Sequence, residues 1–145
     1  MFGLVILLVA GGRAVVAQPE DGRVTRVVDG DTIHVSVDGR DETVRLIGID
    51  TPEVGECGFR AASRALGELA AGRRVELVAD GSQDERDRYG RLLAYVDRGD
   101  LDLGETMLRR GWAEVYVFDR AFERLGRYRE AASAGARRGA AARCS

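Results

Sequence analysis

Short runs of alternating apolar and polar residues recur along the chain and predict β-strands. Ile33, Val35 and Val37 alternate with polar neighbours, which is typical of a strand buried on one face. Apolar or β-branched runs predict four further strands, at residues 24–28, 43–49, 75–78 and 92–96. Asp38-Gly39, between the second and third of these strands, indicates a hairpin turn because both residues tolerate positive φ angles.

Three segments have the apolar spacing of helices. Apolar residues recur every three or four positions over residues 59–71, and Gly72 follows as a helix end. A short helix is predicted around residues 103–108. A last helix is predicted to begin at Asp119, with Arg124, Arg127 and Arg129 on a solvated face. Five strands with a helix between the third and fourth match a five-stranded OB-fold β-barrel with about three α-helices, so the predicted class is mainly β with helices (α+β).

The N-terminal segment has the pattern of an export signal. Residues 2–10 are an apolar run, and Val15 and Ala17 suit the −3 and −1 positions of a signal-peptidase site. We therefore expect residues 1–17 to be a signal peptide and the protein to be secreted or held in the cell envelope. A buried N-terminal strand and an uncleaved anchor are the alternatives. We expect one domain at residues 22–133, followed by a weakly patterned C-terminal tail at 134–145.

Composition narrows the class of protein. The chain of 145 residues carries 22 Lys+Arg and 24 Asp+Glu, and 45% of its residues are hydrophobic. This mixture excludes a disordered chain and a polytopic membrane protein. A net charge of −2 argues against binding of polyanions through bulk charge, so nucleic acid would have to be bound by a few placed arginines.

Cys57 and Cys144 are the two cysteines of the chain. They do not form a CxxC pair, and the single histidine is not near either of them, so a zinc site is not indicated. In an exported protein they predict one disulfide bond. Two unrelated thiols are the alternative.

Acidic residues gather where the predicted hairpin ends. If the second and third strands pair around a turn at residues 38–41, the numbers of opposed residues sum to about 79. Asp31 would then lie opposite about Gly48 and Arg45 opposite about His34. The carboxylates of Asp31 and Asp50 would converge at one end of the hairpin.

Asp29 and Glu53 lie on the same predicted rim as this pair. Carboxylates without His or Cys favour a hard cation such as Ca²⁺ or Mg²⁺, and a neighbouring arginine favours a phosphate as third component. The alternative is that each Asp-Gly is only a turn and each arginine only a solvated side chain.

Three segments in this order resemble the staphylococcal nuclease-like (thermonuclease) family. They are VVDGDT at 27–32, VRLIGIDTPE at 44–53 and DRYGRLLAYV at 87–96, and the resemblance covers about residues 22–133. It implies an OB-fold and calcium-dependent hydrolysis of DNA and RNA to 3′-phosphate products. It also implies roles for individual residues.

By this resemblance Asp31, Asp50 and Thr51 correspond to the metal ligands, with Thr51 lending its backbone carbonyl, and Asp29 to an acid that orients the metal site. Glu53 corresponds to the general base. Arg45 and Arg91 correspond to the arginines that grip the phosphate, and the residues that contact the nucleotide correspond to Arg88, Tyr89 and Tyr116.

The chain departs from the family pattern outside these positions. The loop at 54–58 is short, and Phe118 stands where the family often has Tyr. We expect a secreted, monomeric calcium-dependent nuclease without a stable protein partner or membrane association. The alternatives are a non-catalytic OB-fold module that binds nucleic acid or protein, and an envelope protein whose barrel is only a scaffold. Retention of Asp31, Arg45, Asp50, Glu53 and Arg91 favours the enzyme.

Overall fold

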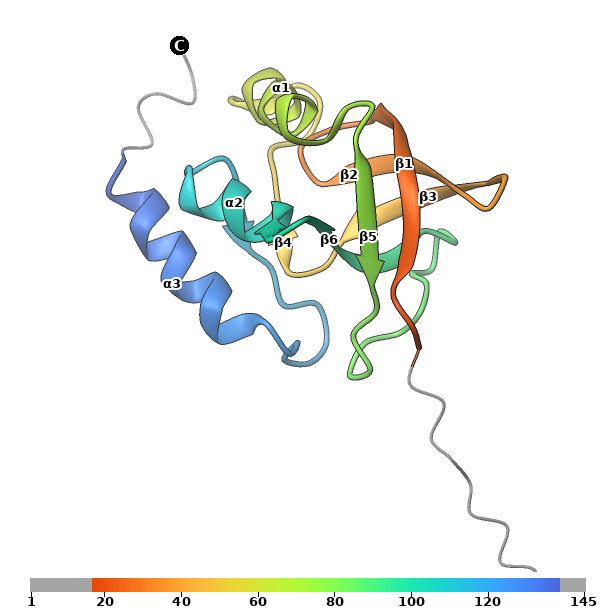
Figure 1. Ribbon diagram of the computed structural model, residues 1–145. Coiled ribbons are helices and arrows are strands. Elements are labelled where there is room, and N and C mark those ends of the chain that lie inside the picture. Colours follow the sequence, from red (N-terminus) through yellow and green to blue (C-terminus); the bar gives the residue numbers. More distant parts are fainter. Residues whose placement is uncertain (1–16, 139–145) are drawn as a thin grey trace, which may run out of the picture.

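A closed β-barrel with three helices around it forms the body of the computed structural model, which describes residues 17–138 (Figure 1). Antiparallel pairing gives the strand order β3-β2-β1-β5-β6-β7, and a parallel pairing of β3 with β6 closes the barrel. The five barrel strands are β1 (Glu20–Val27), β2 (Thr32–Val37), β3 (Arg40–Leu46), β5 (Arg74–Val78) and β6 (Leu92–Arg98). The predicted five-stranded OB-type barrel is therefore confirmed.

The β2–β3 hairpin has a tighter turn than the sequence pattern indicated. Val37 pairs with Arg40, and both Asp38 (φ 48) and Gly39 (φ 77) adopt the left-handed conformation of a two-residue turn. The predicted register was therefore wrong by about two residues. Arg45 lies opposite Thr32 rather than His34, and the peptide N–H of Leu46 donates to the carbonyl of Asp31.

The third strand ends earlier than its apolar run. It was predicted to reach residue 49, but β3 ends at Leu46, and Ile49–Asp50 forms a separate short strand, β4, which pairs with β8 (Glu114–Val115). Gly48 lies between the two strands and has a φ of 81°. A Cβ atom at this position would be only 2.5 Å from the ring of Phe122. The chain turns here because only glycine accepts both this φ and this close approach.

Three helices pack against the barrel. They are α1 (Phe59–Ala70), α2 (Leu103–Arg109, directly after the short strand β7, Leu101–Asp102) and α3 (Leu125–Ala136). Asp102 caps α2, because its Oδ1 accepts from the peptide N–H of Glu105 at 3.0 Å. Figure 1 shows α1 over one end of the barrel and α2 beside α3. The predicted second helix is confirmed.

The start of α3 differs from the prediction. Asp119 does not cap it, since the helix begins at Leu125 after a loop. The peptide N–H groups of Glu123 and Arg124 donate instead to the Asp80 carboxylate (2.7 Å) and the Tyr95 hydroxyl (3.3 Å). Side chains distant in sequence thus provide the acceptors at this helix entry, which a local capping pattern does not reveal.

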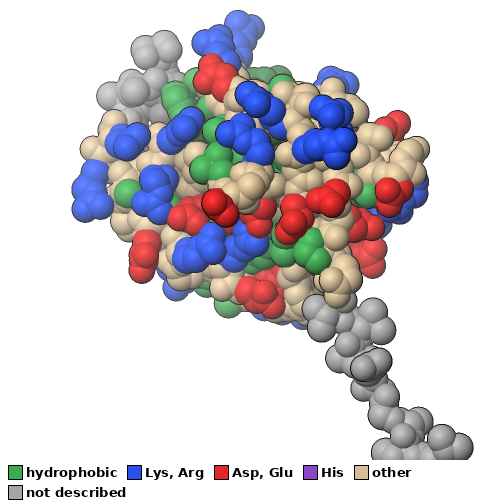
Figure 2. Space-filling model, in the orientation of Figure 1, with side chains coloured by type: hydrophobic (Ala, Val, Ile, Leu, Met, Phe, Trp, Pro, Cys, Tyr) green, Lys and Arg blue, Asp and Glu red, His purple; other side chains and the backbone are tan. Residues whose placement is uncertain are grey.

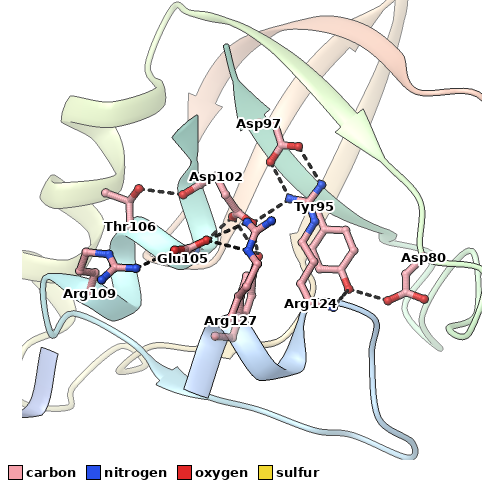
Figure 3. Close-up of polar contacts among 10 residues, drawn as sticks. Asp80, Tyr95, Asp97, Asp102, Glu105, Thr106, Arg109, Arg124 and Arg127 are labelled. Carbon is pink, nitrogen blue, oxygen red and sulfur yellow. Dashed lines mark hydrogen bonds and ion pairs between the residues drawn. The ribbon is translucent and has the colours of Figure 1, made fainter. Parts of the chain in front are cut away.

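The arginines at the start of α3 and within it were predicted to be solvated, but Arg124 is not. The Arg124 guanidinium pairs with Asp97 (2.7 Å) and Asp102 (2.7 Å) and lies over the Tyr95 ring at 4.1 Å (Figure 3). Arg127 pairs with Asp102 and Glu105 but stays largely exposed, and Arg129 is exposed as well, so the prediction was wrong for Arg124 alone. These contacts attach α3 to the barrel.

Figure 2 shows acidic side chains in a band across the middle of one face, with basic side chains mainly above and below it. Strand register places Asp21, Glu76, Asp97 and Asp102 opposite one another across β1, β5, β6 and β7.

Two predictions concern the chain ends. Most of the predicted signal peptide and Cys144 of the predicted Cys57–Cys144 disulfide lie outside the described residues, so both stay predictions. None of the helices found at residues 17–138 has the length and hydrophobicity that a membrane span requires.

Candidate active site

The residues singled out in the sequence meet around one cavity. It has a volume of about 560 Å³ and is lined by the end of β3, by β4 and by the loops at 29–31, 83–91 and 116–122. All ten predicted metal, catalytic and nucleotide-contacting residues line it, namely Asp29, Asp31, Arg45, Asp50, Thr51, Glu53, Arg88, Tyr89, Arg91 and Tyr116. The structure thus brings them together, while their individual roles stay predictions.

Asp31 is held in place by several hydrogen bonds to its neighbours. It is buried, and its Oδ2 accepts from both the peptide N–H and the hydroxyl of Thr51, each at 3.0 Å. Its Oδ1 accepts from the Thr32 hydroxyl at 3.0 Å. Asp29 lies beside it, with its Oδ1 accepting from the peptide N–H of Asp31 at 3.0 Å. These bonds hold the Asp31 carboxylate in one orientation.

Arg45 lies between the two aspartates that were expected to converge. Its Nε is 3.4 Å from Asp31 Oδ1, and one of its terminal nitrogens is 3.4 Å from Asp50 Oδ1. Its other terminal nitrogen donates to the carbonyl of Leu46 at 2.7 Å, and the side chain is only 11% exposed. A guanidinium held at three points in this way is oriented before any ligand arrives.

The carboxylates of the cavity carry an excess of negative charge. Burial, followed by the nearby charge of Asp31, raises the pKa of Asp29. The pKa of Asp50 is raised by burial, by Asp31 and by Glu53, against the opposing effect of Arg45. Arg45 does not fully neutralise this group, and a bound cation would lower the repulsion among its members.

The candidate metal ligands in the cavity are all oxygen atoms. Asp31 and Asp50 have carboxylates, and the buried Thr51, whose backbone carbonyl is predicted to be a ligand, is hydrogen-bonded to Asp31 through its peptide N–H. No group of three or more Asp, Glu, His or Cys side chains within residues 17–138 could hold a metal ion by itself. The set fits a hard cation such as Ca²⁺, which takes six to eight oxygen ligands, provided that water and a ligand supply the remainder.

Glu53 is exposed on the same rim. Its peptide N–H donates to Glu56 Oε2 at 2.9 Å, and the peptide N–H of Glu56 donates back to the carbonyl of Glu53 at 2.9 Å. The turn at 53–56 is therefore closed by its own backbone and by Glu56. Glu53 itself lines the cavity, and its charge acts on Asp50.

Asp87 organises the loop that carries Arg91, a role that the sequence analysis missed. Its Oδ1 accepts from the peptide N–H groups of Tyr89 (2.9 Å) and Arg91 (3.0 Å), and its Oδ2 accepts from Arg91 Nε at 2.6 Å. Burial opposes ionisation of Asp87, but these bonds outweigh it and lower the pKa of the carboxyl. An aspartate two residues before Tyr89-Gly90 is the local signal that indicates such a turn.

Aromatic side chains border the cavity on two sides. Tyr89 is 67% exposed, and the Arg88 and Arg91 guanidinium carbons lie 4.8 and 5.4 Å from its ring centroid. On the other side the rings of Tyr116 and Phe118 are 6.4 Å apart, and Phe118 is 80% exposed. These rings offer apolar faces next to cationic groups.

Comparison with known proteins shows the family. The model of the staphylococcal nuclease homologue family matches residues 43–139, more than half of the chain. The chain belongs to this family. The match includes Arg45, Asp50, Glu53, Arg91 and Tyr116, while Asp29 and Asp31 precede it.

Curated relatives agree with this assignment. The chain is 42% identical over 107 residues to the SPbeta prophage-derived endonuclease YokF of Bacillus subtilis (strain 168), covering 68% of this chain and 36% of that protein. It is 41% identical over 102 residues to Endonuclease YncB of the same strain, covering 65% and 47% of the two chains. It is 42% identical over 101 residues to the thermonuclease of Staphylococcus intermedius, covering 66% and 59%. The chain therefore spans less than two thirds of the length of these relatives.

Proposed function

We propose that the protein is a calcium-dependent nuclease that hydrolyses phosphodiester bonds of DNA and RNA and leaves 3′-phosphate products. The observation that carries this proposal is the position of Arg45 between Asp31 and Asp50, in a cavity that Arg91 and Glu53 also line. Relatives named endonuclease and thermonuclease support the same reaction class.

The arginines bind and stabilise the phosphate. Arg45 is fixed by its backbone contact and by two carboxylates, so it meets the substrate in a set orientation. As water attacks, negative charge grows on the phosphate oxygens, and two guanidinium groups stabilise this charge more strongly than that of the ground state. Arg91, held at Nε by Asp87, keeps its terminal nitrogens for the substrate.

Glu53 takes the proton of the attacking water. Its exposed carboxylate adjoins Asp50, whose pKa it helps to raise. Attack in line forms a new P–O bond while the P–O5′ bond breaks. The 3′ side keeps the phosphate, and Arg91 stabilises the charge on the departing 5′ oxygen.

Asp31, Asp50 and the carbonyl of Thr51 would hold the calcium ion. When bound, the ion supplies positive charge that offsets the phosphate and lowers the pKa of a coordinated water. Asp29 would keep Asp31 oriented through its bond to the Asp31 peptide N–H. Phosphate and base contacts would come from Arg88, Tyr89 and Tyr116.

Release of acid-soluble nucleotides from denatured DNA and from RNA tests the proposal. We expect release with Ca²⁺, none with a chelator, and 3′-phosphate ends on the products. Asp31→Asn should abolish release, while Asp100→Asn, the same change at an exposed turn residue, should not. Equal release with and without chelator would contradict calcium dependence. No release at any Ca²⁺ concentration would indicate a binding module instead.

Export is a separate part of the proposal. The apolar run at 2–10 and the small residues at 15 and 17 support a cleaved signal peptide. Expression of the full chain in a bacterial host, followed by N-terminal sequencing of the extracytoplasmic fraction, tests it. A new N-terminus at Gln18 is expected, and full-length protein retained in the cytoplasm would contradict export.

A further inference from the structure

Two loops that line the candidate active site are joined to each other by residues other than the predicted catalytic ones. The first, here called the arginine loop, spans residues 81–91 and carries Arg88, Tyr89 and Arg91. The second, here called the aromatic loop, spans residues 116–123 and carries Tyr116 and Phe118. Both line the same cavity, although more than twenty residues separate them in sequence.

Asp80 stands where the two loops meet. It is buried, two residues after the end of β5 and directly before the arginine loop. Its Oδ1 accepts from the peptide N–H (2.8 Å) and the hydroxyl (2.6 Å) of Ser82, at the start of that loop. Its Oδ2 accepts from the peptide N–H of Glu123 (2.7 Å), at the end of the aromatic loop, and from the Tyr95 hydroxyl of the barrel (Figure 3). One carboxylate thus joins both loops to the barrel.

Further contacts continue the junction toward the cavity. The side-chain amide of Gln83 donates to the backbone carbonyls of Arg120 (3.2 Å) and Ala121 (3.3 Å). Arg120 also pairs with Asp84 at 3.1 Å, but both side chains are largely exposed, and such pairs contribute little. The Ser82 hydroxyl also lies 3.2 Å from the carbonyl oxygen of Ala121, so the two loops are linked by the buried Asp80 bonds and by contacts of Ser82 and Gln83.

We infer that Asp80 and Gln83 are positioning residues for catalysis, which set the spacing of the arginine loop and the aromatic loop and thereby the place of Arg91 beside the substrate. This inference rests on the proposed nuclease function. Neither residue is needed for the chemistry itself. A displacement of about 1 Å at a catalytic group lowers a rate by as much as about 10²-fold, so the junction affects turnover through geometry alone.

Asp80→Asn tests the inference, because it removes acceptor capacity with little change of shape. An amide has a single acceptor oxygen, so the peptide N–H of either Ser82 or Glu123 loses its partner. We expect Asp80→Asn to lower kcat/KM on denatured DNA about 10-fold or more. In a protein that already carries Arg91→Ala, the same change should lower kcat/KM less than about 2-fold, because Asp80 acts through the place of Arg91. Amide hydrogen exchange should rise in both loops, whether or not substrate is present.

Asp102→Asn is the matched control. Asp102 is likewise a buried aspartate that accepts from a tyrosine hydroxyl (Tyr128, 2.9 Å) and a peptide N–H (Glu105, 3.0 Å), but these groups belong to α3 and α2. It also pairs with Arg124 and Arg127 (Figure 3). Assayed below its unfolding temperature, this variant should lose stability yet keep kcat/KM within about 2-fold of the parent. A second variant, Gln83→Ala, removes surface bonds of the junction and should lower kcat/KM about 3-fold or more without unfolding. It decides the question if Asp80→Asn does not fold.

The outcomes separate this inference from the function on which it rests. A parent protein without calcium-stimulated nuclease activity would contradict the proposed function. In an active parent, an unchanged kcat/KM in Asp80→Asn and in Gln83→Ala would overturn only the positioning role. An equal loss with and without Arg91, or an equal loss in Asp102→Asn, would also overturn it, because either result indicates general destabilisation.

Discussion

The Oδ2 atom of Asp87 accepts a 2.6 Å hydrogen bond from the Nε of Arg91, four residues later in the same loop. Asp87 also closes the turn between them by accepting from two peptide N–H groups. The loop thus contains its own support for the arginine that faces the cavity. A carboxylate at Nε directs the two terminal nitrogens outward, which suits bidentate recognition of a phosphate.

Replacing Asp87 should therefore reduce turnover more than it reduces substrate binding. In Asp87→Asn the amide cannot accept at both positions, so either Arg91 Nε or the turn loses its partner. We expect kcat to fall about 10-fold with a smaller change in KM, because Arg91 acts mainly on charge that develops in the transition state. Steady-state kinetics on denatured DNA measure this. Asp41→Asn, at the exposed end of the β2–β3 hairpin, is the control, and an equal fall in both variants would refute the role of Asp87.

Replacing Glu53 should affect catalysis without affecting the stability of the fold. Its side chain is exposed, and no bond of the described residues depends on its carboxylate. Glu53→Gln should lower kcat by about 10²-fold or more, the usual contribution of a general base, while the urea midpoint of unfolding stays unchanged. Glu68→Gln, on the exposed side of α1, should leave both quantities unchanged. Parent-like turnover in Glu53→Gln would mean that another group accepts the proton of the water.

Much of the site could be predicted because its parts are local in sequence. Asp31, Arg45 and Asp50 belong to one hairpin and its continuation, so their convergence follows from strand pairing. The two aspartates converge on Arg45 even though the predicted register was wrong by about two residues. The reason is that the chain turns at Gly48, which brings Asp50 back toward Asp31. The local turn signal at Asp38-Gly39 was found, but the number of residues in the turn was not.

Contacts between distant segments could not be predicted. The β4–β8 pairing joins residues 49–50 to 114–115, and two-residue strands have too little periodicity to be detected. The entry of α3 depends on Asp80 and Tyr95, which belong to other elements. Arg124 has the helical spacing of an exposed residue, and only the folded chain places Asp97 and Asp102 next to it.

Acid should weaken the fold partly through Asp80. Burial opposes its ionisation, but hydrogen bonds from Ser82, Tyr95 and Glu123 outweigh this and hold its pKa below the ordinary value of 3.8. A carboxyl group with a lowered folded-state pKa stabilises the protein above its unfolded pKa, and this contribution is lost as pH falls through the folded pKa. The difference in unfolding free energy between the parent and Asp80→Asn should be constant near neutral pH and should shrink below about pH 4. Urea titrations across this range measure it, and a difference that grows with acid would show that the sign is wrong.

The predicted Cys57–Cys144 disulfide can be tested without activity. If the protein is exported and oxidised, non-reducing peptide mapping should give one cross-linked pair. Reduction should then lower the unfolding temperature, because a bond that closes so long a loop contributes up to about 4–5 kcal/mol in the chain-entropy model. A Cys57→Ser/Cys144→Ser variant should be insensitive to reductant. Quantitative alkylation of two thiols in the untreated exported protein would refute the bond.

Arg124, the residue directly before α3, should be the arginine whose removal destabilises the fold most among Arg124, Arg127 and Arg129. Its guanidinium is the partner of Asp97 and one of two partners of Asp102, and its side chain is only 18% exposed. Arg124→Met keeps much of the packing on Tyr95 but leaves Asp97 without its partner. We expect a loss of about 2–4 kcal/mol in unfolding free energy, near the lower end of the cost of breaking a buried pair, because Asp102 keeps Arg127.

Two comparisons make the Arg124 prediction specific. Arg129→Met, the same change at an exposed position of α3, should alter the unfolding free energy by less than about 0.5 kcal/mol. In the double variant Arg124→Met/Asp97→Asn the loss should be smaller than the sum of the two single losses, since the uncompensated carboxylate is then absent. Additive losses would show that Arg124 stabilises the fold through its contacts with Tyr95 and Asp102 rather than through its ion pair with Asp97. Denaturant titrations of the parent, the two single variants and the double variant distinguish these possibilities.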